Sequence, residues 1–411
     1  MTPNKANPLI YSDLILGYFF AMNDFKLLEN KKIAIVGAGM AGLTLARLLQ
    51  LQNAEVKVFE RDFDQNVRVQ GSTLDLHEGT GLEAMKRAGL LEEFYKHHRV
   101  DASKMLLVDR SLNIKFDDHN FAKHTSETRP EIDRAPLRDI LLNSLLPNTV
   151  IWDSNFSSME KENSGWRVHF KNGTSSYADL VVGADGANSK VRPYLSSLKP
   201  IYSGITLIQG DIDKAATNVP SLFAFAKGGK VMAFDDEKMI GYGSKGDGSL
   251  MFVACFKCSE NWLRESGVDF KNKDQILSWF KKEFSTWSDQ WHEFFACDEA
   301  LFLPRPQYYF PFDQKWEPQE NLTVIGDAAH RMPPFAGEGA NVAMQDSFEL
   351  AEVLKSNQFS EIKTALEHFE KDMIARGANA TRQTLVNTEK MFSKNSSEQM
   401  LSFFNRVSQI S

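Results

Sequence analysis

Three glycines that follow a short apolar run form the most informative pattern in the sequence. Gly37, Gly39 and Gly42 come directly after Ile33–Val36 and open an amphipathic stretch that predicts a helix. In such a turn the first glycine permits a tight reversal, the second lets a pyrophosphate approach the backbone, and the third lets the helix pack closely. A second apolar run then ends in Glu60, whose carboxylate can accept hydrogen bonds from an adenosine ribose. The pattern predicts a strand–helix–strand unit that binds a dinucleotide.

A second glycine-rich stretch, Ile325–Asn341 (IGDAAHRMPPFAGEGAN), follows an apolar run that predicts a buried strand. Gly337 and Gly339 would let the backbone approach a ligand closely, while Pro333 and Pro334 withdraw two amide donors and stiffen the approach. The helical pattern that follows would point its positive end at whatever lies in front. This arrangement suits an anion or an electron-rich ring.

Length, charge and cysteine content exclude several classes of protein. A chain of 411 residues is long enough for two domains or one interleaved pair. A formal net charge of −7, with no basic run, argues against a nucleic-acid partner. Three cysteines are too few for a secreted disulfide scaffold, which favours a reducing, cytoplasmic location.

The N-terminal segment lacks the features of a targeting signal. Leu14–Met22 (LILGYFFAM) is apolar, but Asp13 precedes it in place of a basic region. No span of about 20 apolar residues follows. We expect neither export nor stable membrane insertion, and we interpret residues 1–30 as an N-terminal extension in which Met22 is a candidate start.

Two further segments complete a set of three motifs. Asp185-Gly186 lies within VVGADGANSKVR (residues 181–192), and Gly326-Asp327 opens the second glycine-rich stretch. With the first glycine loop they resemble, in order and spacing, the motifs of the class A flavoprotein monooxygenases, typified by para-hydroxybenzoate hydroxylase. The resemblance runs from residue 32 to about residue 385. It implies an α/β fold in which a Rossmann-like, GR2-type FAD-binding domain is interleaved with an antiparallel-sheet substrate domain, with a long C-terminal helix.

The alternation of apolar and polar residues locates the substrate domain. Short runs broken by glycine and charged turns between Ile205 and Phe256 predict an antiparallel sheet. Helices are predicted around Gln275–Phe284 and Gln290–Ala296, and Ile362–Met391 is predicted to be one long helix. The expected order is an N-terminal extension at 1–30, FAD-binding segments at 31–88, 126–199 and 292–372, substrate-domain segments at 89–125 and 200–291, and a C-terminal helix at 373–411.

The resemblance assigns cofactor roles to individual residues. In the family the glycine loop holds the ADP half of FAD, and the acid of the last motif, here Asp327, reaches its ribityl and phosphate part. GSTLDLHEGTGLEAMKRAGL (residues 71–90) and DRAPLRDILLNSL (residues 133–145) are similar to the tetracycline-inactivating members, which implies FAD contacts for Asp75 and Arg138 and an NADPH contact for Arg68. From its residue type alone, Arg138 could instead be a solvated helix charge. The expected cofactor set is Gly37, Gly39, Gly42, Glu60, Arg61, Arg68, Asp75, Arg138, Asp185, Asp327, Pro334, Gly337, Gly339 and Asn341.

The same likeness implies a substrate-binding set, which consists of Gln209, Lys230, Met232, Met251 and Phe335. Three positions depart from the tetracycline-inactivating enzymes: Lys230 stands in place of an arginine, Gly241 in place of a phenylalanine, and Met251 in place of a histidine. Lysine lacks the planar fork of arginine, and methionine cannot make the hydrogen bonds of an imidazole. We therefore expect weak or altered oxidation of tetracycline, the reaction that would confer antibiotic resistance, and a pocket better suited to a related polycyclic or aromatic compound.

The implied activity is that of an FAD-dependent, NAD(P)H-consuming monooxygenase, with NADPH as the expected donor. In the family, oxygen adds to the reduced flavin to form a flavin hydroperoxide, whose distal oxygen passes to an aromatic or polyketide-like substrate. This chemistry is centred on the flavin and needs no catalytic side chain. Two alternatives are a flavin-dependent halogenase, although the sequence has no Trp-x-Trp-x-Ile-Pro segment, and an FAD-fold binding protein that sequesters a hydrophobic ligand. We expect a monomer whose partners are a small-molecule substrate and O2.

Two other groups of residues invite a chemical role. Cys255 and Cys258, with His292 and Cys297 downstream, could be arranged as zinc ligands. The first two lie in a predicted strand, where residues three apart face opposite sides, and a second close-spaced ligand pair is missing. We expect no metal site. His330 could act as a general base, but a supporting role behind Asp327 is the favoured interpretation.

Overall fold

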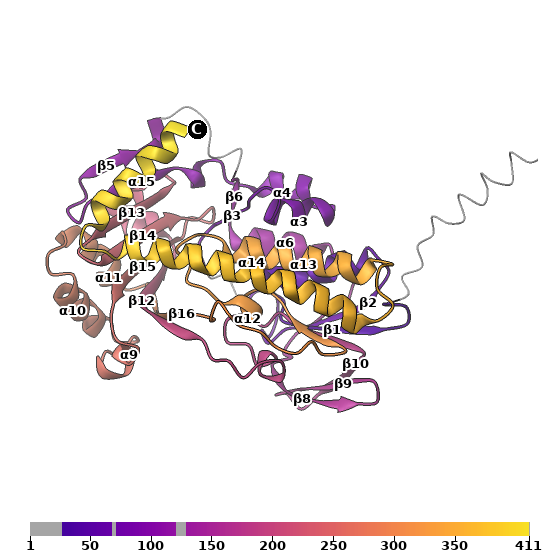
Figure 1. Cartoon of the computed structure of the whole chain (residues 1–411). Coiled ribbons are helices and arrows are strands. Elements are labelled where there is room, and N and C mark those ends of the chain that lie inside the picture. The colour runs from indigo at the N-terminus through magenta and orange to yellow at the C-terminus, as the bar shows by residue number, and fades with distance from the viewer. Residues whose placement is uncertain (1–26, 68–70, 121–128, 411) are drawn as a thin grey trace, which may run out of the picture.

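The computed structural model describes residues 27–67, 71–120 and 129–410. Most of the expected N-terminal extension, including Leu14–Met22, and the candidate NADPH contact Arg68 lie outside the described residues. A parallel sheet and a larger mixed sheet occupy opposite ends of the molecule, and the long helix α14 (Ile362–Met391) runs between them (Figure 1). The predicted α/β architecture is confirmed.

The first sheet is built from short, continuously apolar runs. Its strand order is β17-β11-β1-β2-β7, and every neighbouring pair is parallel. Such strands are covered on both faces, which explains why they are apolar throughout. As predicted, β1 (Lys32–Val36), α2 (Met40–Gln50) and β2 (Glu55–Phe59) form a strand–helix–strand unit. The other strands are β7 (Val150–Ile151), β11 (Leu180–Gly183) and β17 (Leu322–Val324).

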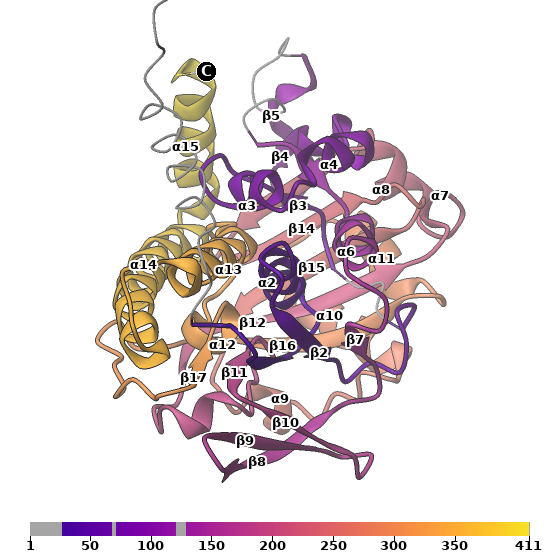
Figure 2. The ribbon, with the colours of Figure 1, turned by 90° about the vertical axis from the view of Figure 1, so that its right-hand side faces the viewer.

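Helices and small sheets surround this sheet. Helix α13 (Gly339–Lys355) packs on α2, with α6 (Arg134–Asn143) beside them (Figure 2). The remaining elements of this half are α3 (Gly81–Arg87), α4 (Leu91–His97), α12 (Asp327–His330), the 3-10 turn η3 (Arg192–Tyr194), the pair β3 (Leu74–Asp75) and β6 (Glu131–Ile132), and a three-stranded sheet of β8 (Phe156–Glu162), β9 (Gly165–Phe170) and β10 (Ser175–Ala178).

The large sheet has the strand order β16-β12-β15-β14-β13-β4-β5. Its strands are β4 (Met105–Val108), β5 (Ile114–Asp117), β12 (Ile201–Ile212), β13 (Lys230–Asp235), β14 (Lys238–Ser244), β15 (Leu250–Lys257) and β16 (Leu301–Tyr309). The predicted antiparallel sheet is correct for β12 to β15, but β13 pairs with β4 in parallel. Periodicity in sequence shows neither the partner nor the direction of a strand, so this pairing was not predicted.

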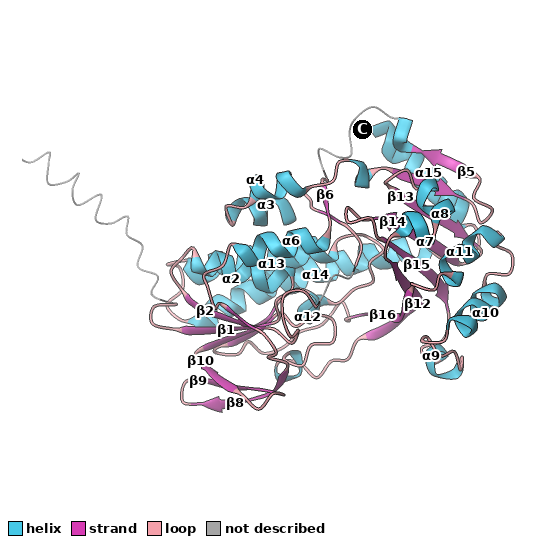
Figure 3. Ribbon diagram, turned by 180° about the vertical axis from the view of Figure 1, so that it is seen from behind, coloured by secondary structure: helices cyan, strands magenta, loops and turns pink. Residues whose placement is uncertain are grey.

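Helices cover one face of the large sheet, as Figure 3 shows from behind. Phe252 on the sheet stacks on Phe294 at a centroid distance of 4.4 Å, and Phe280 stacks on Phe295 at 3.8 Å. These helices and turns are α7 (Ala215–Asn218), α8 (Pro220–Phe225), α9 (Trp262–Glu265), α10 (Lys273–Glu283), α11 (His292–Ala296) and η4 (Asp289–Trp291). Helix α8 interrupts the predicted strand run because Pro220 starts a helical turn there.

Two helices close the chain. Helix α14 has the predicted bounds, so the expected boundary between residues 372 and 373 falls inside it. Helix α15 (Ser396–Ile410) then turns back across the large sheet and contacts β13 and β5. The 3-10 turns η1 (Asp101–Ser103) and η2 (Asp118–Asn120) lie next to β4 and β6. The C-terminal segment therefore joins both halves of the molecule.

Glu370 connects α14 to the parallel sheet. Its carboxylate accepts hydrogen bonds from the Trp316 indole (2.8 Å) and the Thr323 hydroxyl (2.7 Å). Burial raises the pKa of Glu370 to about 7, and the neighbouring Glu367 adds to the increase, while the two hydrogen bonds oppose it. The carboxyl group is therefore more easily protonated in the folded chain than in the unfolded one.

We expect this group to make the fold less stable as pH rises. A folded pKa above the unfolded value of 4.5 gives a contribution that is complete below that value and is lost as pH rises through about 7. Replacing Glu370 with glutamine should therefore remove about 2 kcal/mol of the decrease in the free energy of unfolding between about pH 5 and pH 8, measured by urea denaturation. Glu389→Gln, exposed on the same helix and not among the groups that shift the pKa of Glu370, is the control, and equal pH dependence in both variants would contradict the assignment.

Candidate cofactor and substrate site

The glycine turn after β1 contains two glycines that the fold needs and one that it does not. Gly37 has a φ of +109°, and an added Cβ would lie 2.4 Å from the Ala184 carbonyl oxygen. At Gly42 an added Cβ would lie 2.0 Å from the carbonyl oxygen of Gly37. At Gly39 it would meet nothing within 4 Å among the described residues. The space in front of Gly39 is therefore open to a ligand.

The same turn presents positive charge. Gly39 is the N-cap of α2; the described residues provide no side-chain cap, and the first turn holds no acid. The helix end thus carries unpaired N–H donors and roughly half a positive charge. Glu60 is buried beside it and accepts hydrogen bonds from the amides of Ala38 (2.6 Å) and Asp62 (3.0 Å). Each carboxylate oxygen keeps a lone pair for a further donor. These features fit a pyrophosphate joined to a ribose.

Two arginines were expected near this end of the site. Arg61 is exposed at the end of β2. Arg138 is buried, donates to the carbonyl oxygen of Gln65 (2.8 Å), pairs with Asp62 (3.5 Å) and lies over the Trp152 ring. The interpretation of Arg138 as a solvated surface charge is therefore wrong. It supports the segment that follows Glu60.

The second glycine-rich stretch lies in front of another helix end. Asp327 is exposed at the start of α12, and its Oδ1 atom lies 4.0 Å from the position of a Cβ added to Gly339, the first residue of α13. As in α2, no described side chain caps α13 and its first turn holds no acid. Pro334 and Gly337 form a turn closed by a hydrogen bond from the Gly337 amide to the Pro334 carbonyl (3.0 Å). The stretch thus offers a second site for an electron-rich group.

Two residues of the expected cofactor set use their side chains within the protein. Asn341 is buried; its oxygen accepts from the His77 amide (2.8 Å), and its amide donates to the Asp75 carbonyl (2.9 Å). Asp185 accepts from the Ser189 hydroxyl (2.5 Å) and the Lys190 amide (2.7 Å), and burial raises the pKa of its carboxyl. Both side chains help to position loops.

A buried ionic network fixes the turn at Gly326. Asp346 has no exposed surface and accepts from the Gly326 amide (2.8 Å), His330 Nε2 (2.5 Å) and Arg376 (2.8 Å). Burial would lower the pKa of His330, but the charge of Asp346 outweighs it and raises the pKa. The contact with Asp346 thus occupies the Nε2 atom of His330 in the interior of the protein. This supports the favoured interpretation that it acts behind Asp327.

A cavity of about 980 Å³ separates this turn from the large sheet. Strand register places alternate residues of β13, β14 and β15 on its floor, so that Met232 neighbours Gly241, and Gly241 neighbours Val253. Two glycines, Gly241 and Gly243, make the floor hollow. The Pro334–Gly337 turn forms one wall, and α14 and α15 contribute another, with Asn387, Met391, Met400 and Phe404 among the lining residues.

The expected substrate residues separate into two groups. Lys230, Met232, Met251 and Phe335 all line the cavity. Gln209 lies on the same face of the sheet, but its amide donates to Asp211 (2.6 Å), and it is not part of the lining of this cavity. Four of the five predicted residues are therefore brought together.

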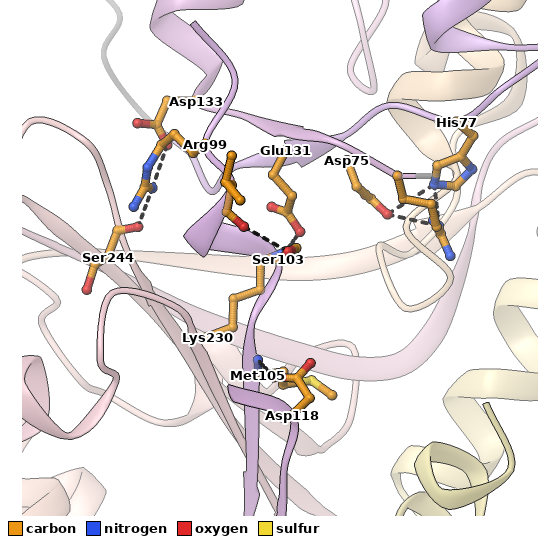
Figure 4. Close-up of polar contacts among 12 residues, drawn as sticks. Asp75, His77, Arg99, Ser103, Met105, Asp118, Glu131, Asp133, Lys230 and Ser244 are labelled. Carbon is orange, nitrogen blue, oxygen red and sulfur yellow. Dashed lines mark hydrogen bonds and ion pairs between the residues drawn. The ribbon is translucent and has the colours of Figure 1, made fainter. Parts of the chain in front are cut away.

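The polar wall of the cavity was largely missed by sequence reasoning. Asp75 on β3 pairs with Arg129 (2.9 Å) and His77 (3.0 Å). Burial would raise the pKa of Asp75, but these partners outweigh it and lower the pKa to about 2. Glu131 lies opposite Asp75 on β6 and pairs with Lys230, which rises from the large sheet (Figure 4). Arg129 and Glu131 lie outside the motifs found in the sequence, and His77, within residues 71–90, was given no role there. The pairing of β3 with β6 brings the segments that carry them to the cavity.

The cysteines take no part in a metal site among the described residues. Within residues 27–67, 71–120 and 129–410 no cluster of three or more His, Cys, Asp or Glu side chains could hold a metal ion. Cys255 lies in β15 and lines the cavity, and burial raises the pKa of its thiol well above the usual range. Cys258 follows the end of that strand and contacts the Tyr202 hydroxyl. In the same described ranges, no helix is both long and apolar enough to cross a membrane.

Comparison with known proteins identifies a family. The family described as "FAD binding domain" matches residues 30–238 and 314–383. "Monooxygenase penA" of Penicillium thymicola is 28% identical over 90% of this chain and 97% of its own length. Both glycine-rich stretches fall within the matched residues.

Solved structures show the same fold. The tetracycline destructase Tet(55) has a TM-score of 0.74 at 20% identity, covering 92% of this chain and 95% of that one. Klebsiella pneumoniae HpxO, solved with FAD and uric acid, has a TM-score of 0.72 at 18% identity, covering 93% and 94%. At such identities the likeness concerns the fold alone.

The contrast between Gly39 and Gly42 gives a test of the dinucleotide site. Gly39→Ala should leave the thermal midpoint of the apoprotein nearly unchanged, because the added Cβ meets no described atom, but should weaken FAD binding about tenfold by blocking close approach. Gly42→Ala should destabilise the apoprotein itself by about 1–3 kcal/mol through overpacking. Flavin fluorescence titration and thermal denaturation measure the two effects, and unaltered FAD affinity in Gly39→Ala would refute the placement.

Proposed function

Because the chain belongs to the FAD binding domain family and is an FAD-dependent monooxygenase, we propose that it uses NADPH and O2 to add one oxygen atom to an aromatic or polycyclic substrate. One observation carries the proposal: the cavity is lined both by the Pro334–Gly337 turn of the flavin motif and by the apolar floor of the large sheet. A flavin ring and a flat substrate would meet in that space.

The two uncapped helix ends fit the cofactor. The N-terminus of α2, with Glu60, would hold the ADP half of FAD, and Asp327 with the N-terminus of α13 would lie at the flavin half. Asp75 would contact the cofactor from the cavity wall. Bound FAD supplies the redox chemistry, accepting a hydride from a reduced nicotinamide and activating dioxygen.

The residues of this chain would bind, orient and shield the substrate. Met232, Met251 and Val253 offer an apolar floor, hollowed at the neighbouring glycines, on which a ring can lie. Phe335 packs edge-on against Phe392 at 5.1 Å and closes the side next to the flavin turn. Exclusion of water by these side chains would limit loss of activated oxygen. Their packing against the substrate would hold its acceptor carbon close to the flavin.

The nicotinamide would bind without a domain of its own. The sequence contains one glycine turn of the dinucleotide-binding type, and the structure assigns it to the first strand–helix–strand unit. HpxO, a protein of the same fold solved with FAD and uric acid, pairs a flavin with a small planar compound in one molecule, which supports a planar substrate here. The two functions that the sequence alone left open, a halogenase and a non-catalytic binding protein, predict different outcomes in the same assay.

We expect purified protein to be yellow and to oxidise NADPH when a suitable aromatic or polycyclic compound is added. Mass spectrometry should show one oxygen atom in the product that derives from labelled O2, and catalase should leave product formation unchanged. Halogenated products in the presence of bromide would support the halogenase. Tight binding of a compound without flavin reduction by NADPH or NADH would support the binding protein and contradict the proposal.

The cavity floor predicts poor use of tetracycline. Met251 and Gly241 line the cavity at positions where the tetracycline-inactivating enzymes carry histidine and phenylalanine. Each lost polar contact in a buried site costs about 1–3 kcal/mol, so the KM for tetracycline should lie well above the micromolar range. Met251→His should lower it, whereas Met239→His on the same floor should not. A micromolar KM with no gain from Met251→His would show that this interpretation of the floor is wrong.

A further inference from the structure

Two carboxylates lie side by side on the wall of the cavity. The strands β3 and β6 pair Asp75 directly with Glu131, so both side chains extend from the same face, and both line the cavity. Figure 4 shows them along this wall, with Lys230 reaching up from the large sheet below. Asp75 is matched by Arg129 and His77, whereas Glu131 is matched by Lys230.

Only one of the two carboxylate oxygens of Glu131 has a partner among the described residues. Its side chain is 6% exposed, and its Oε1 atom pairs with the Lys230 ammonium. Its Oε2 atom is buried and has no hydrogen-bond partner among the described residues. A buried carboxylate oxygen without a donor costs free energy, and such atoms are rare in folded proteins. In the wall of a cavity this atom marks the place where a ligand supplies the missing donor.

Lys230 provides the complementary group. Its ammonium carries three donors, of which Glu131 takes one, and its side chain is 33% exposed on the cavity. Together the pair presents one acceptor and further donors next to each other. Two of the other cations in the lining are already matched, since Arg129 pairs with Asp75, and Lys245 with Asp211 (3.4 Å). Because the charges of Glu131 and Lys230 cancel, this pair suits a neutral ligand better than a carboxylate or a phosphate.

We infer that Glu131 and Lys230 form a recognition element that selects neutral, planar substrates carrying an N–H or O–H donor next to a carbonyl acceptor. Glu131 Oε2 accepts from the donor of the substrate, and the Lys230 ammonium donates to its carbonyl oxygen. The inference rests on the proposed function in placing the substrate in this cavity. Lys230 belongs to β13, two residues from the floor residue Met232, which puts the pair on the substrate side of the cavity.

Binding of two matched tricyclic probes tests the inference without turnover. Phenanthridin-6(5H)-one has an N–H next to a carbonyl, and its N-methyl derivative carries a methyl group in place of the donor hydrogen. Calorimetry on the FAD-loaded protein should show about tenfold tighter binding of the parent compound, which corresponds to one hydrogen bond to a charged group. The double variant Glu131→Met, Lys230→Met should bind both probes equally, and Glu131→Gln, which keeps an acceptor oxygen, should retain part of the preference.

The control replaces a matched pair elsewhere. Lys238 and Glu283 form an ion pair (3.5 Å) between β14 and α10, and neither is part of the lining of the cavity. Lys238→Met, Glu283→Met should keep the preference of the wild type. The inference is overturned if neither probe binds, if the preference survives in the Glu131/Lys230 variant, or if that variant loses FAD instead. Failure of NADPH oxidation alone would count against the proposed function and leave the binding result intact.

Discussion

The architecture of the cofactor site depends on one buried carboxylate. Asp346 is completely enclosed, and a charge in that position is tolerable only while its donors stay in place. The donors come from three elements: the turn after β17, the short helix α12 and the long helix α14. Gly377 on α14 leaves the room that this needs, since an added Cβ would lie 2.6 Å from the Cβ of His330. The exposed Asp327, which follows Gly326, is thereby positioned by the interior of the protein.

A second constraint applies to the cavity, where an ion pair links two sheets. Its floor belongs to one sheet and its polar wall to another, and the two meet through the pair of Glu131 with Lys230. Helix α15 closes the space from a third direction, where Phe404 stacks on Phe116 at a centroid distance of 6.0 Å. The apolar floor gives area for binding, while the few polar atoms of the wall fix orientation. Because the floor supplies binding area and the wall sets orientation, the same fold can bind different substrates when the residues of either surface differ.

The sequence predicted the features that depend only on residues close together in the chain. Gly37, Gly39, Gly42 and Glu60 lie within one strand–helix–strand unit, so their spacing alone located the turn and the acid beside it. Arg138 could not be distinguished from a surface charge, because its burial against Trp152 depends on a strand that follows later. Asn341 was expected to shape the flavin site. Its side chain forms hydrogen bonds with the backbone of His77 and Asp75, and the sequence does not show these contacts. Glu131 and Arg129 were missed, and so was the contact of the predicted C-terminal helix with the cavity, because pairing of distant segments, which no periodicity records, brings them there.

The strand order of the parallel sheet has a consequence for synthesis on the ribosome. Strand β1 lies between β2 and β11, and β17, the edge strand next to β11, is near residue 323, so the sheet cannot be completed until about three quarters of the chain has been made. Strand β4 likewise waits for β13, its parallel neighbour from the other side of a long insertion. Until then, apolar strands present unpaired edges, which are sites of aggregation. A nascent chain of this protein therefore exposes unpaired apolar strands over a long interval of its synthesis.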